Sequence, residues 1–291
     1  MKHVCGCVFA ALLATHPPTA QQPPFRTSVE IVEIDVSVTR GTQPVQGLTS
    51  RDFVLTDNGV AQQVESVMLD RLPIDVTLVL DVSQSLLGER LTHLVQAGDG
   101  LVTALRSGDR AALITFSHQI ELAVPMTSET TEIRKALAGL EAHGSTALRD
   151  AVHLAIELYP RDRARSLLLV FTDGHDTVSW LTEDAVLDSA RRSGAVIHAL
   201  RLESDPFLDR LVQAAGGRTW SATSDRQLRE LFTKALDEMR ARYLLTYTPR
   251  GVDTAGWHAV KVSLKNGRAD ITARPGYFVA APAPSGSSPP R

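Results

Sequence analysis

Three oxygen-bearing side chains alternate along one short loop that follows an apolar run. Asp81, Ser83 and Ser85 come directly after "IDVTLVL", at positions i, i+2 and i+4. If the loop curves, the carboxylate and the two hydroxyls can turn toward one point. Hard oxygen donors of low total charge suit Mg²⁺ better than zinc, which prefers nitrogen and sulfur. Taken alone, the pattern is explained equally well by capping of a following helix by either serine.

Two further loops carry oxygen atoms at comparable places. Thr146 lies in the Gly/Ser turn of "HGSTALRDAV", just before a predicted helix. In "LLLVFTDGHD", Asp173 follows a predicted buried strand, and Gly174 gives the backbone room to turn. Ligands of open parallel α/β sheets bind beyond the carboxyl ends of the strands. The three loops together therefore predict a single metal site at that edge.

The elements that must position these loops are buried strands that alternate with amphipathic helices. Short apolar runs begin at residue 74, namely "IDVTLVL", "RAALITF", "RSLLLVF" and "GAVIHAL". Between and after them, apolar residues recur at helical spacing over 91–106, 129–140, 147–158, 183–192, 205–217 and 224–243. Continuous apolar strands between helices predict a doubly wound, mostly parallel sheet with helices on both faces. We expect this α/β domain to occupy residues 74–238.

The flanking segments 28–72 and 241–280 instead alternate apolar and polar residues, which is typical of strands with one solvent-facing side. Asp57-Asn58-Gly59 predicts a hairpin in the first segment, and "NGR" at 266–268 predicts another in the second. Neither segment is large enough for an independent β domain. We therefore expect one small β-sandwich into which the α/β domain is inserted. Two separate sheets that flank or extend the α/β domain are the alternative.

The ends of the chain and its charge limit the classes of function. "MKHVCGCVFAALLA" followed by "THPPTA" predicts a signal peptide over residues 1–20, and the Pro/Ser/Gly-rich residues 281–291 predict a disordered tail. The apolar stretch of the signal peptide is too short to span a bilayer. A net charge of −3 argues against a nucleic-acid partner. We expect a secreted protein, periplasmic or extracellular, with no transmembrane segment in the mature chain.

Catalysis finds little support in the sequence, which has no G-x-S-x-G elbow, no Walker loop and no H-E-x-x-H motif. A metal-assisted hydrolase would need a general base near the metal, and only His175 and Asp176 are candidates. We interpret these two residues, with Gln84 and Ser145, as a candidate ligand-binding rim around the metal. We expect a protein that is not an enzyme.

The whole set of motifs resembles the von Willebrand factor type A fold. The residues that match the metal-ion-dependent adhesion site of that family are D-x-S-x-S at Asp81, Ser83 and Ser85, Thr146 in "GSTALRDA", and Asp173 in "FTDG". The resemblance covers residues 74–238. The flanking β segments resemble, more loosely, those of a group of secreted bacterial proteins known from acidobacteria.

Two positions depart from the family pattern. Gln84 stands between the serines where the family often has glycine, and "GST" replaces the more usual double glycine before the threonine. The Gln84 side chain could crowd the loop or contact a ligand, whereas the serine of "GST" is small enough to be tolerated.

The resemblance implies a role for each matched residue. Ser83 and Ser85 would bind Mg²⁺ (or Mn²⁺) directly, and Thr146 would approach it when a ligand is bound. Asp81 and Asp173 would act largely through water, which leaves the metal electron-poor. The remaining position would accept an Asp or Glu carboxylate from a protein partner. The resemblance thus implies an adhesion module. The alternative is a structural component of an envelope complex, in which the metal only supports the loop conformation.

Overall fold

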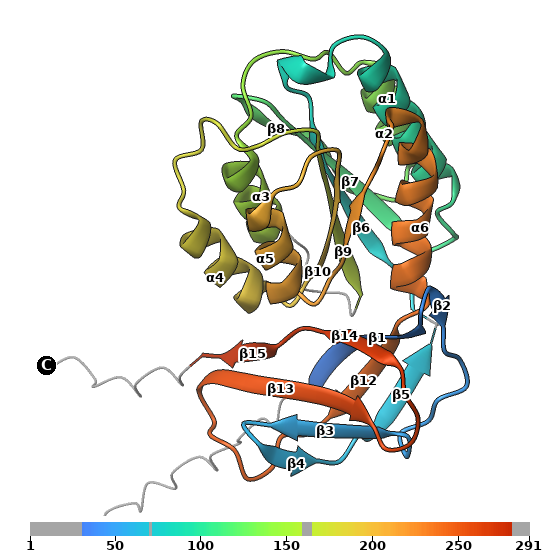
Figure 1. Ribbon diagram of the computed structural model, residues 1–291, viewed down its shortest axis with the longest axis vertical. Coiled ribbons are helices and arrows are strands. Elements are labelled where there is room, and N and C mark those ends of the chain that lie inside the picture. Colours follow the sequence, from blue (N-terminus) through green and yellow to red (C-terminus); the bar gives the residue numbers. More distant parts are fainter. Residues whose placement is uncertain (1–30, 70–71, 159–164, 281–291) are drawn as a thin grey trace, which may run out of the picture.

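The chain forms an α/β domain that stands on a small β-sandwich (Figure 1). The computed structural model of the chain describes residues 31–69, 72–158 and 165–280. The predicted signal peptide (1–20) and tail (281–291) therefore lie outside the described residues. Among the helices of the described part, none has the length and apolar character needed to cross a membrane.

Six strands form the central sheet, in the order β11-β10-β9-β6-β7-β8. They are β6 (Asp75–Asp81), β7 (Arg110–Phe116), β8 (Ile120–Thr127), β9 (Ser166–Thr172), β10 (Val196–Arg201) and β11 (Thr219–Ser221). All neighbours pair in parallel except β7 and β8, which pair antiparallel. The predicted mostly parallel sheet is confirmed. Strand β8 was not predicted, because its polar residues and Pro125 are of a kind that only an edge strand tolerates.

Helices cover both faces of this sheet, as predicted (Figure 1). The helices on one face are α1 (Glu89–Thr103), α2 (Thr130–Ala138) and α6 (Leu228–Arg240). Those on the other are α3 (Leu148–Glu157), α4 (Glu183–Ser193) and α5 (Pro206–Ala214). Two short 3₁₀ helices are η1 (Gln84–Leu86) and η2 (Asp225–Gln227).

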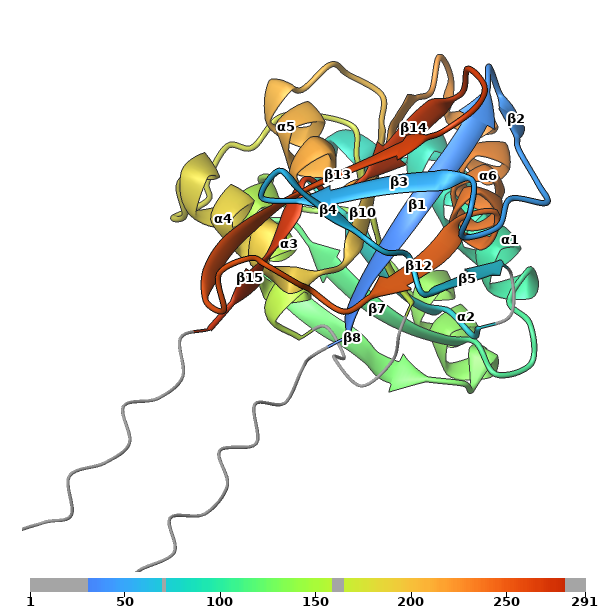
Figure 2. The same ribbon diagram turned by 90° about the horizontal axis from the view of Figure 1, so that it is seen from below.

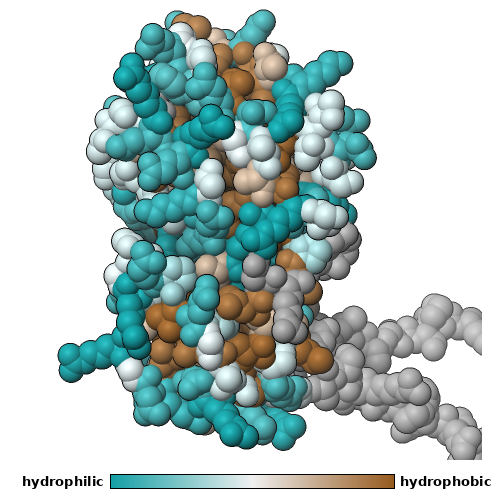
Figure 3. All heavy atoms as spheres, turned by 90° about the vertical axis from the view of Figure 1, so that its right-hand side faces the viewer, coloured by the Kyte–Doolittle hydropathy of each residue, from teal (hydrophilic) through white to brown (hydrophobic). Residues whose placement is uncertain are grey.

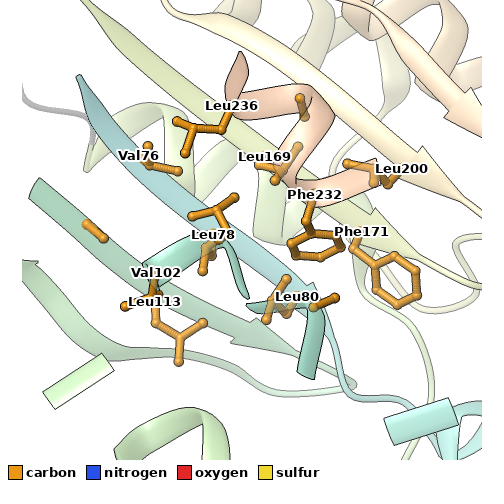
Figure 4. Close-up of a cluster of buried hydrophobic side chains, with 14 of the residues drawn as sticks. Val76, Leu78, Leu80, Val102, Leu113, Leu169, Phe171, Leu200, Phe232 and Leu236 are labelled. Carbon is orange, nitrogen blue, oxygen red and sulfur yellow. The ribbon is translucent and has the colours of Figure 1, made fainter. Parts of the chain in front are cut away.

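Side chains of β6 alternate between two apolar cores. Leu78 and Leu80 contribute to the core under α1, α2 and α6, where they gather with Phe232 of α6 (Figure 4). Val79 points the other way, into the core under α3, α4 and α5. Successive strand residues face opposite sides of a sheet, so a strand buried on both faces reads as the continuous apolar run seen in the sequence.

Two antiparallel sheets make up the sandwich. The five-stranded sheet contains β1 (Val32–Arg40), β2 (Gln43–Pro44), β5 (Ser66–Leu69), β12 (Tyr243–Tyr247) and β14 (Asp270–Ala273). The four-stranded sheet contains β3 (Phe53–Asp57), β4 (Val60–Gln62), β13 (Gly256–Leu264) and β15 (Gly276–Val279). One flank of the molecule carries hydrophobic residues over its sandwich part, where the edge strand β5 has half-buried side chains (Figure 3).

Strands from before and after the α/β domain pair within both sheets of the sandwich. β1 lies between β12 and β14, and β3 pairs with β13 (Figure 2). Apolar residues of the two sheets, among them Ile34, Leu55 and Leu245, share one core. The two flanking segments thus form a single sandwich. The domain limits drawn from the sequence stay predictions.

Turn residues explain one correct hairpin prediction and one wrong one. Asn58 and Gly59 have positive φ angles of 47° and 81°, which suit a tight turn, and they join β3 to β4 in the predicted hairpin. The hairpin predicted at 266–268 is wrong, because β13 pairs with β3 and β15 whereas β14 pairs with β1 in the other sheet. The turn carries the chain from one sheet to the other. Pro275, which lacks an N–H, then separates β14 from β15.

Buried polar contacts join the sandwich to the amino ends of the central strands. Just before β9, Arg165 donates to Asp35 Oδ1 at 3.1 Å and to the Met239 carbonyl. Gly216, with φ of 67°, has room only for a hydrogen, since a Cβ there would lie 2.2 Å from the backbone nitrogen of Arg274. The carboxyl ends of the strands lie at the opposite edge, away from the sandwich (Figure 1).

Candidate metal centre

Asp81 is the last residue of β6 and is completely buried. Its Oδ1 accepts a hydrogen bond from the Ser83 N–H at 2.8 Å, and its Oδ2 accepts one from Thr172 Oγ1 at 2.6 Å. Burial raises the pKa of Asp81 to about 6; these hydrogen bonds oppose the rise and the negative charge of Asp173 adds to it. A carboxylate in this environment is stabilised in its ionised form by a nearby cation.

The hydroxyls of Ser83 and Ser85 continue from Asp81 to Asp173 as a row of oxygen atoms. Ser83 Oγ lies 3.0 Å from Ser85 Oγ, and Ser85 Oγ donates to Asp173 Oδ1 at 2.7 Å. The alternative that these serines cap a helix is wrong. Ser83 precedes η1 but its side chain makes no capping hydrogen bond, and the residue before α1 is Gly88.

Thr146 comes from the third loop, and backbone hydrogen bonds hold this loop against the other two. The Thr146 N–H donates to Thr177 Oγ1 at 3.0 Å, and the Thr146 carbonyl accepts from the Thr177 N–H at 2.9 Å. The Gln84 N–H donates to the Gly144 carbonyl at 2.9 Å. The structure therefore brings the loops of all five sequence-predicted metal residues together at one edge of the sheet.

Three of the four predicted rim residues are exposed at these loops. Gln84, Ser145 and His175 all have exposed side chains. The His175 Nδ1 lies 3.4 Å from Asp205 Oδ2, so this histidine leans toward the start of α5. Their contact with a ligand stays a prediction.

Asp176, the fourth predicted rim residue, forms hydrogen bonds to other side chains and backbone groups of the protein. Its Oδ1 accepts from Arg149 Nη2 at 2.9 Å, and its Oδ2 accepts from the Arg149 N–H at 2.9 Å and from the Ser179 hydroxyl. Burial alone would raise the pKa of Asp176, but these hydrogen bonds outweigh it and hold the pKa below its usual value. Asp176 thus braces the loop after β9 against α3.

Two polar residues at this site were not predicted from the sequence. Thr172 donates to Asp81, and Arg90 Nη1 lies 3.1 Å from Asp173 Oδ2. The only signal for Thr172 is its place directly before Asp173, at the end of a buried strand. Nothing in the spacing of the sequence marks Arg90, because its contact depends on how α1 meets the loop after β9.

An apolar rim at the same edge was also not expected. Leu87 is 58% exposed, Val178 42% and Trp180 94%. Leu87 lies two residues after Ser85, and the Val178 N–H donates to the Thr146 carbonyl at 3.4 Å. A tryptophan in a loop is usually packed, so the nearly complete exposure of Trp180 is unusual.

The chemistry of the donor set fits a small divalent cation. In an octahedral Mg²⁺ site, with metal–oxygen distances of about 2.1 Å, neighbouring ligand oxygens lie about 3 Å apart. The distance of 3.0 Å between the Ser83 and Ser85 hydroxyls, the two predicted direct ligands, is of this size. Within the described residues, no group of three or more His, Cys, Asp or Glu side chains could hold a metal. The candidate therefore depends on hydroxyls and belongs to the oxygen-ligand type.

Fold and site together define a doubly wound α/β domain with carboxylate and hydroxyl side chains gathered at the carboxyl ends of its strands. Residues 76–175 match the family model of the von Willebrand factor type A domain. This part of the chain is a von Willebrand factor type A domain, and the matched segment contains all five predicted metal residues. Membership of the secreted acidobacterial group stays a prediction.

Relatives in sequence share only parts of their length with this chain. An uncharacterized protein of Synechocystis sp. is 32% identical over 111 residues, which cover 36% of this chain and 26% of that protein. The inter-alpha-trypsin inhibitor heavy chain H4 of Bos taurus is 23% identical over 220 residues, covering 68% of this chain and 24% of that protein. The chain thus spans about a quarter of the length of the curated relatives it matches.

Solved structures show the same fold at low sequence identity. Proximal thread matrix protein 1 from the mussel byssus has a TM-score of 0.52 and 16% identity, over 63% of this chain and 50% of that chain. A structure of the same mussel protein with a zinc-occupied MIDAS (metal-ion-dependent adhesion site) motif has a TM-score of 0.50 and 18% identity, over 61% of this chain and 48% of that chain.

Proposed function

We propose that this chain is a secreted, metal-dependent protein-binding module that captures an acidic side chain of a partner. One observation carries the proposal: three separate loops bring carboxylate- and hydroxyl-bearing residues to one edge of the sheet, and in two of these loops the Ser83 and Ser85 hydroxyls and the Asp173 carboxylate form a continuous row of contacts. The related fold of the mussel protein with zinc in its MIDAS motif adds support for a divalent ion at this edge.

The five residues would play two different roles in binding the ion. Ser83, Ser85 and Thr146 would hold Mg²⁺ or Mn²⁺ through their hydroxyls. Because the Ser85 hydroxyl donates its hydrogen to Asp173, its oxygen keeps a lone pair for a cation even while it accepts from the Ser83 hydroxyl. Asp81 and Asp173 supply the negative charge that holds the ion, and the bound ion would offer an electron-poor position to an incoming carboxylate.

The apolar rim adds a second requirement for the partner. Leu87 and Val178 flank the Ser85 and Thr146 loops, and Trp180 stands almost entirely in solvent. Exposed aromatic side chains of this kind often dominate binding energy at protein interfaces. The partner would therefore present an Asp or Glu residue with apolar neighbours.

Binding, rather than hydrolysis, fits the side chains around the centre. Of the two general bases considered from the sequence, Asp176 is engaged by Arg149 and Ser179, and His175 leans toward Asp205. Among the described residues, the contacts of Asp176 hold its own loop, and no contact of His175 is with Ser83, Ser85 or Asp173. Secretion rests on the predicted signal peptide, so the partner would be met outside the cytoplasm.

The test is retention of secreted proteins by the immobilised chain. Secreted proteins of the organism that produces it would be applied in Mg²⁺ buffer and eluted with EDTA, with Thr146→Ala as the matched control. A protein that is retained in Mg²⁺, released by EDTA and not retained by the control supports the proposal. Retention that survives EDTA would contradict it and favour the structural alternative.

A further inference from the structure

Arg90, the second residue of α1, places a positive charge inside the candidate metal centre. Its Nη1 lies 3.1 Å from Asp173 Oδ2 and 3.5 Å from the Ser85 carbonyl. The Arg90 side chain is 48% exposed, whereas that of Asp173 is 1% exposed. The guanidinium thus reaches in from solvent to one oxygen of a buried carboxylate, and the Ser85 hydroxyl occupies the other oxygen.

The place of Arg90 in its helix makes this contact notable. The amino end of a helix carries a partial positive charge, so an arginine in the first turn is electrostatically unfavourable for the helix itself. Gly88, which precedes α1, has no side chain to cap the helix, and Glu89 is the acidic residue of the first turn. An arginine at this position therefore does little to stabilise α1. Its contact with Asp173 instead lies within the candidate metal centre.

We infer that Arg90 is a built-in competitor of the divalent ion for Asp173. This inference rests on the proposed metal site and concerns how strongly that site binds. A cation that binds beside Ser85 and Asp173 can displace the guanidinium, and the ion pair between Arg90 and Asp173 is then lost. If the guanidinium stays, the two positive charges repel each other. Either outcome weakens metal binding. The positive charge of Arg90 also offsets part of the repulsion between Asp81 and Asp173.

The same arrangement couples the metal to an acidic partner. Arg90 is half exposed and has a long flexible stem, so the displaced guanidinium remains at the rim of the site. A partner carboxylate would meet both the ion and this guanidinium, which binds carboxylates well. By linkage, a ligand that neutralises Arg90 raises the affinity for the metal by the same factor as the metal raises the affinity for the ligand.

The test is a calorimetric titration of the whole chain with Mg²⁺ and with Mn²⁺. Arg90→Gln removes the charge and keeps most of the side chain, and Arg90→Lys keeps the charge. Arg134→Gln is the matched control: Arg134 pairs with Asp99 at 3.0 Å near the far end of α1, and its side chain is 44% exposed.

Arg90→Gln is expected to bind Mg²⁺ about tenfold more tightly than wild type, which corresponds to about 1.4 kcal/mol. Arg90→Lys and Arg134→Gln should stay within about twofold of wild type, a free-energy difference of only about 0.4 kcal/mol. Equal or weaker binding by Arg90→Gln overturns the inference and leaves the proposed function standing. Absence of binding in every variant, Arg90→Gln included, overturns the metal site itself and the inference with it.

Discussion

Asp81→Asn should stabilise the metal-free chain and abolish its response to divalent ions. The asparagine oxygen can accept the hydrogen bond of the Ser83 N–H, as Oδ1 does now. Its amide can donate to Thr172 Oγ1, whose own hydrogen then goes to the Gly174 carbonyl, 3.1 Å away. The substitution therefore removes the charge and keeps the buried hydrogen bonds.

The size of the stabilisation follows from the pKa of Asp81. Folding raises this pKa from 3.8 to about 6, so the ionised form is penalised in the folded state. At about 1.4 kcal/mol per pKa unit, the penalty is about 3 kcal/mol. Because the folded-state pKa is the higher one, the penalty is complete above about pH 6 and disappears below about pH 4, where Asp81 is protonated in both states.

Urea unfolding in EDTA measures this difference. At about pH 8, Asp81→Asn should exceed wild type in free energy of unfolding by about 3 kcal/mol, and at about pH 4 the two should agree. Addition of Mg²⁺ to a hundredfold excess over Kd should stabilise wild type by about 2.7 kcal/mol and leave Asp81→Asn unchanged. Asp176→Asn is the control. Folding lowers the pKa of Asp176, so its ionised carboxylate stabilises the folded state at neutral pH. Asp176→Asn should therefore destabilise the chain at neutral pH and preserve the response to Mg²⁺.

Two results would refute this reasoning. If Asp81→Asn is less stable than wild type in EDTA at about pH 8, the buried charge is not a cost to the folded state. If Mg²⁺ stabilises Asp81→Asn as much as wild type, the ion binds elsewhere.

Three further substitutions test, in turn, the metal centre, the apolar rim and the buried contact between the sandwich and the α/β domain. Ser85→Ala should remove the stabilisation by Mg²⁺, and in EDTA it should lower the free energy of unfolding by about 1 kcal/mol, because Asp173 loses a hydrogen-bond donor. Trp180→Ala should weaken partner binding by about 2 kcal/mol in a titration and leave Tm unchanged, because the side chain is 94% exposed. Arg165→Ala should cost about 3–5 kcal/mol in urea unfolding, because Asp35 loses its buried partner, and should leave Mg²⁺ affinity unchanged.

Each of these expectations has a contrary result. Retained Mg²⁺ stabilisation in Ser85→Ala would remove this hydroxyl from the ligand set. Unaltered partner affinity in Trp180→Ala would place the interface away from the apolar rim. A large change of Mg²⁺ affinity in Arg165→Ala would mean that the sandwich governs the site at the other end of the sheet.

Patterns of burial made most of the fold predictable. β6 and β9 are buried on both faces by helices, so every residue of each strand had to be compatible with the interior. The polar residues that interrupt such runs at their ends, Asp81 and Asp173, were therefore conspicuous. Because parallel strands end at one edge, the loops that follow them could be placed together from the sequence alone.

What the sequence did not reveal depends on packing between distant segments. Asn266-Gly267-Arg268 has the residues of a hairpin turn, but pairing of β14 with β1 decides where the chain goes after it. Arg90 is one arginine among many, and its contact with Asp173 arises only when α1 is packed against the sheet. Trp180 is held in solvent because the N–H groups of residues 180 and 181 are bound to Asp150, a long-range contact that no local pattern reveals.

The most direct test of the central claim is X-ray diffraction from crystals of the chain grown with Mn²⁺, with measurement of the anomalous signal. The account predicts one strong peak per chain beside the hydroxyls of Ser83 and Ser85, and its loss in crystals of Ser85→Ala. An anomalous peak at another place only, or no peak at saturating Mn²⁺, would contradict it.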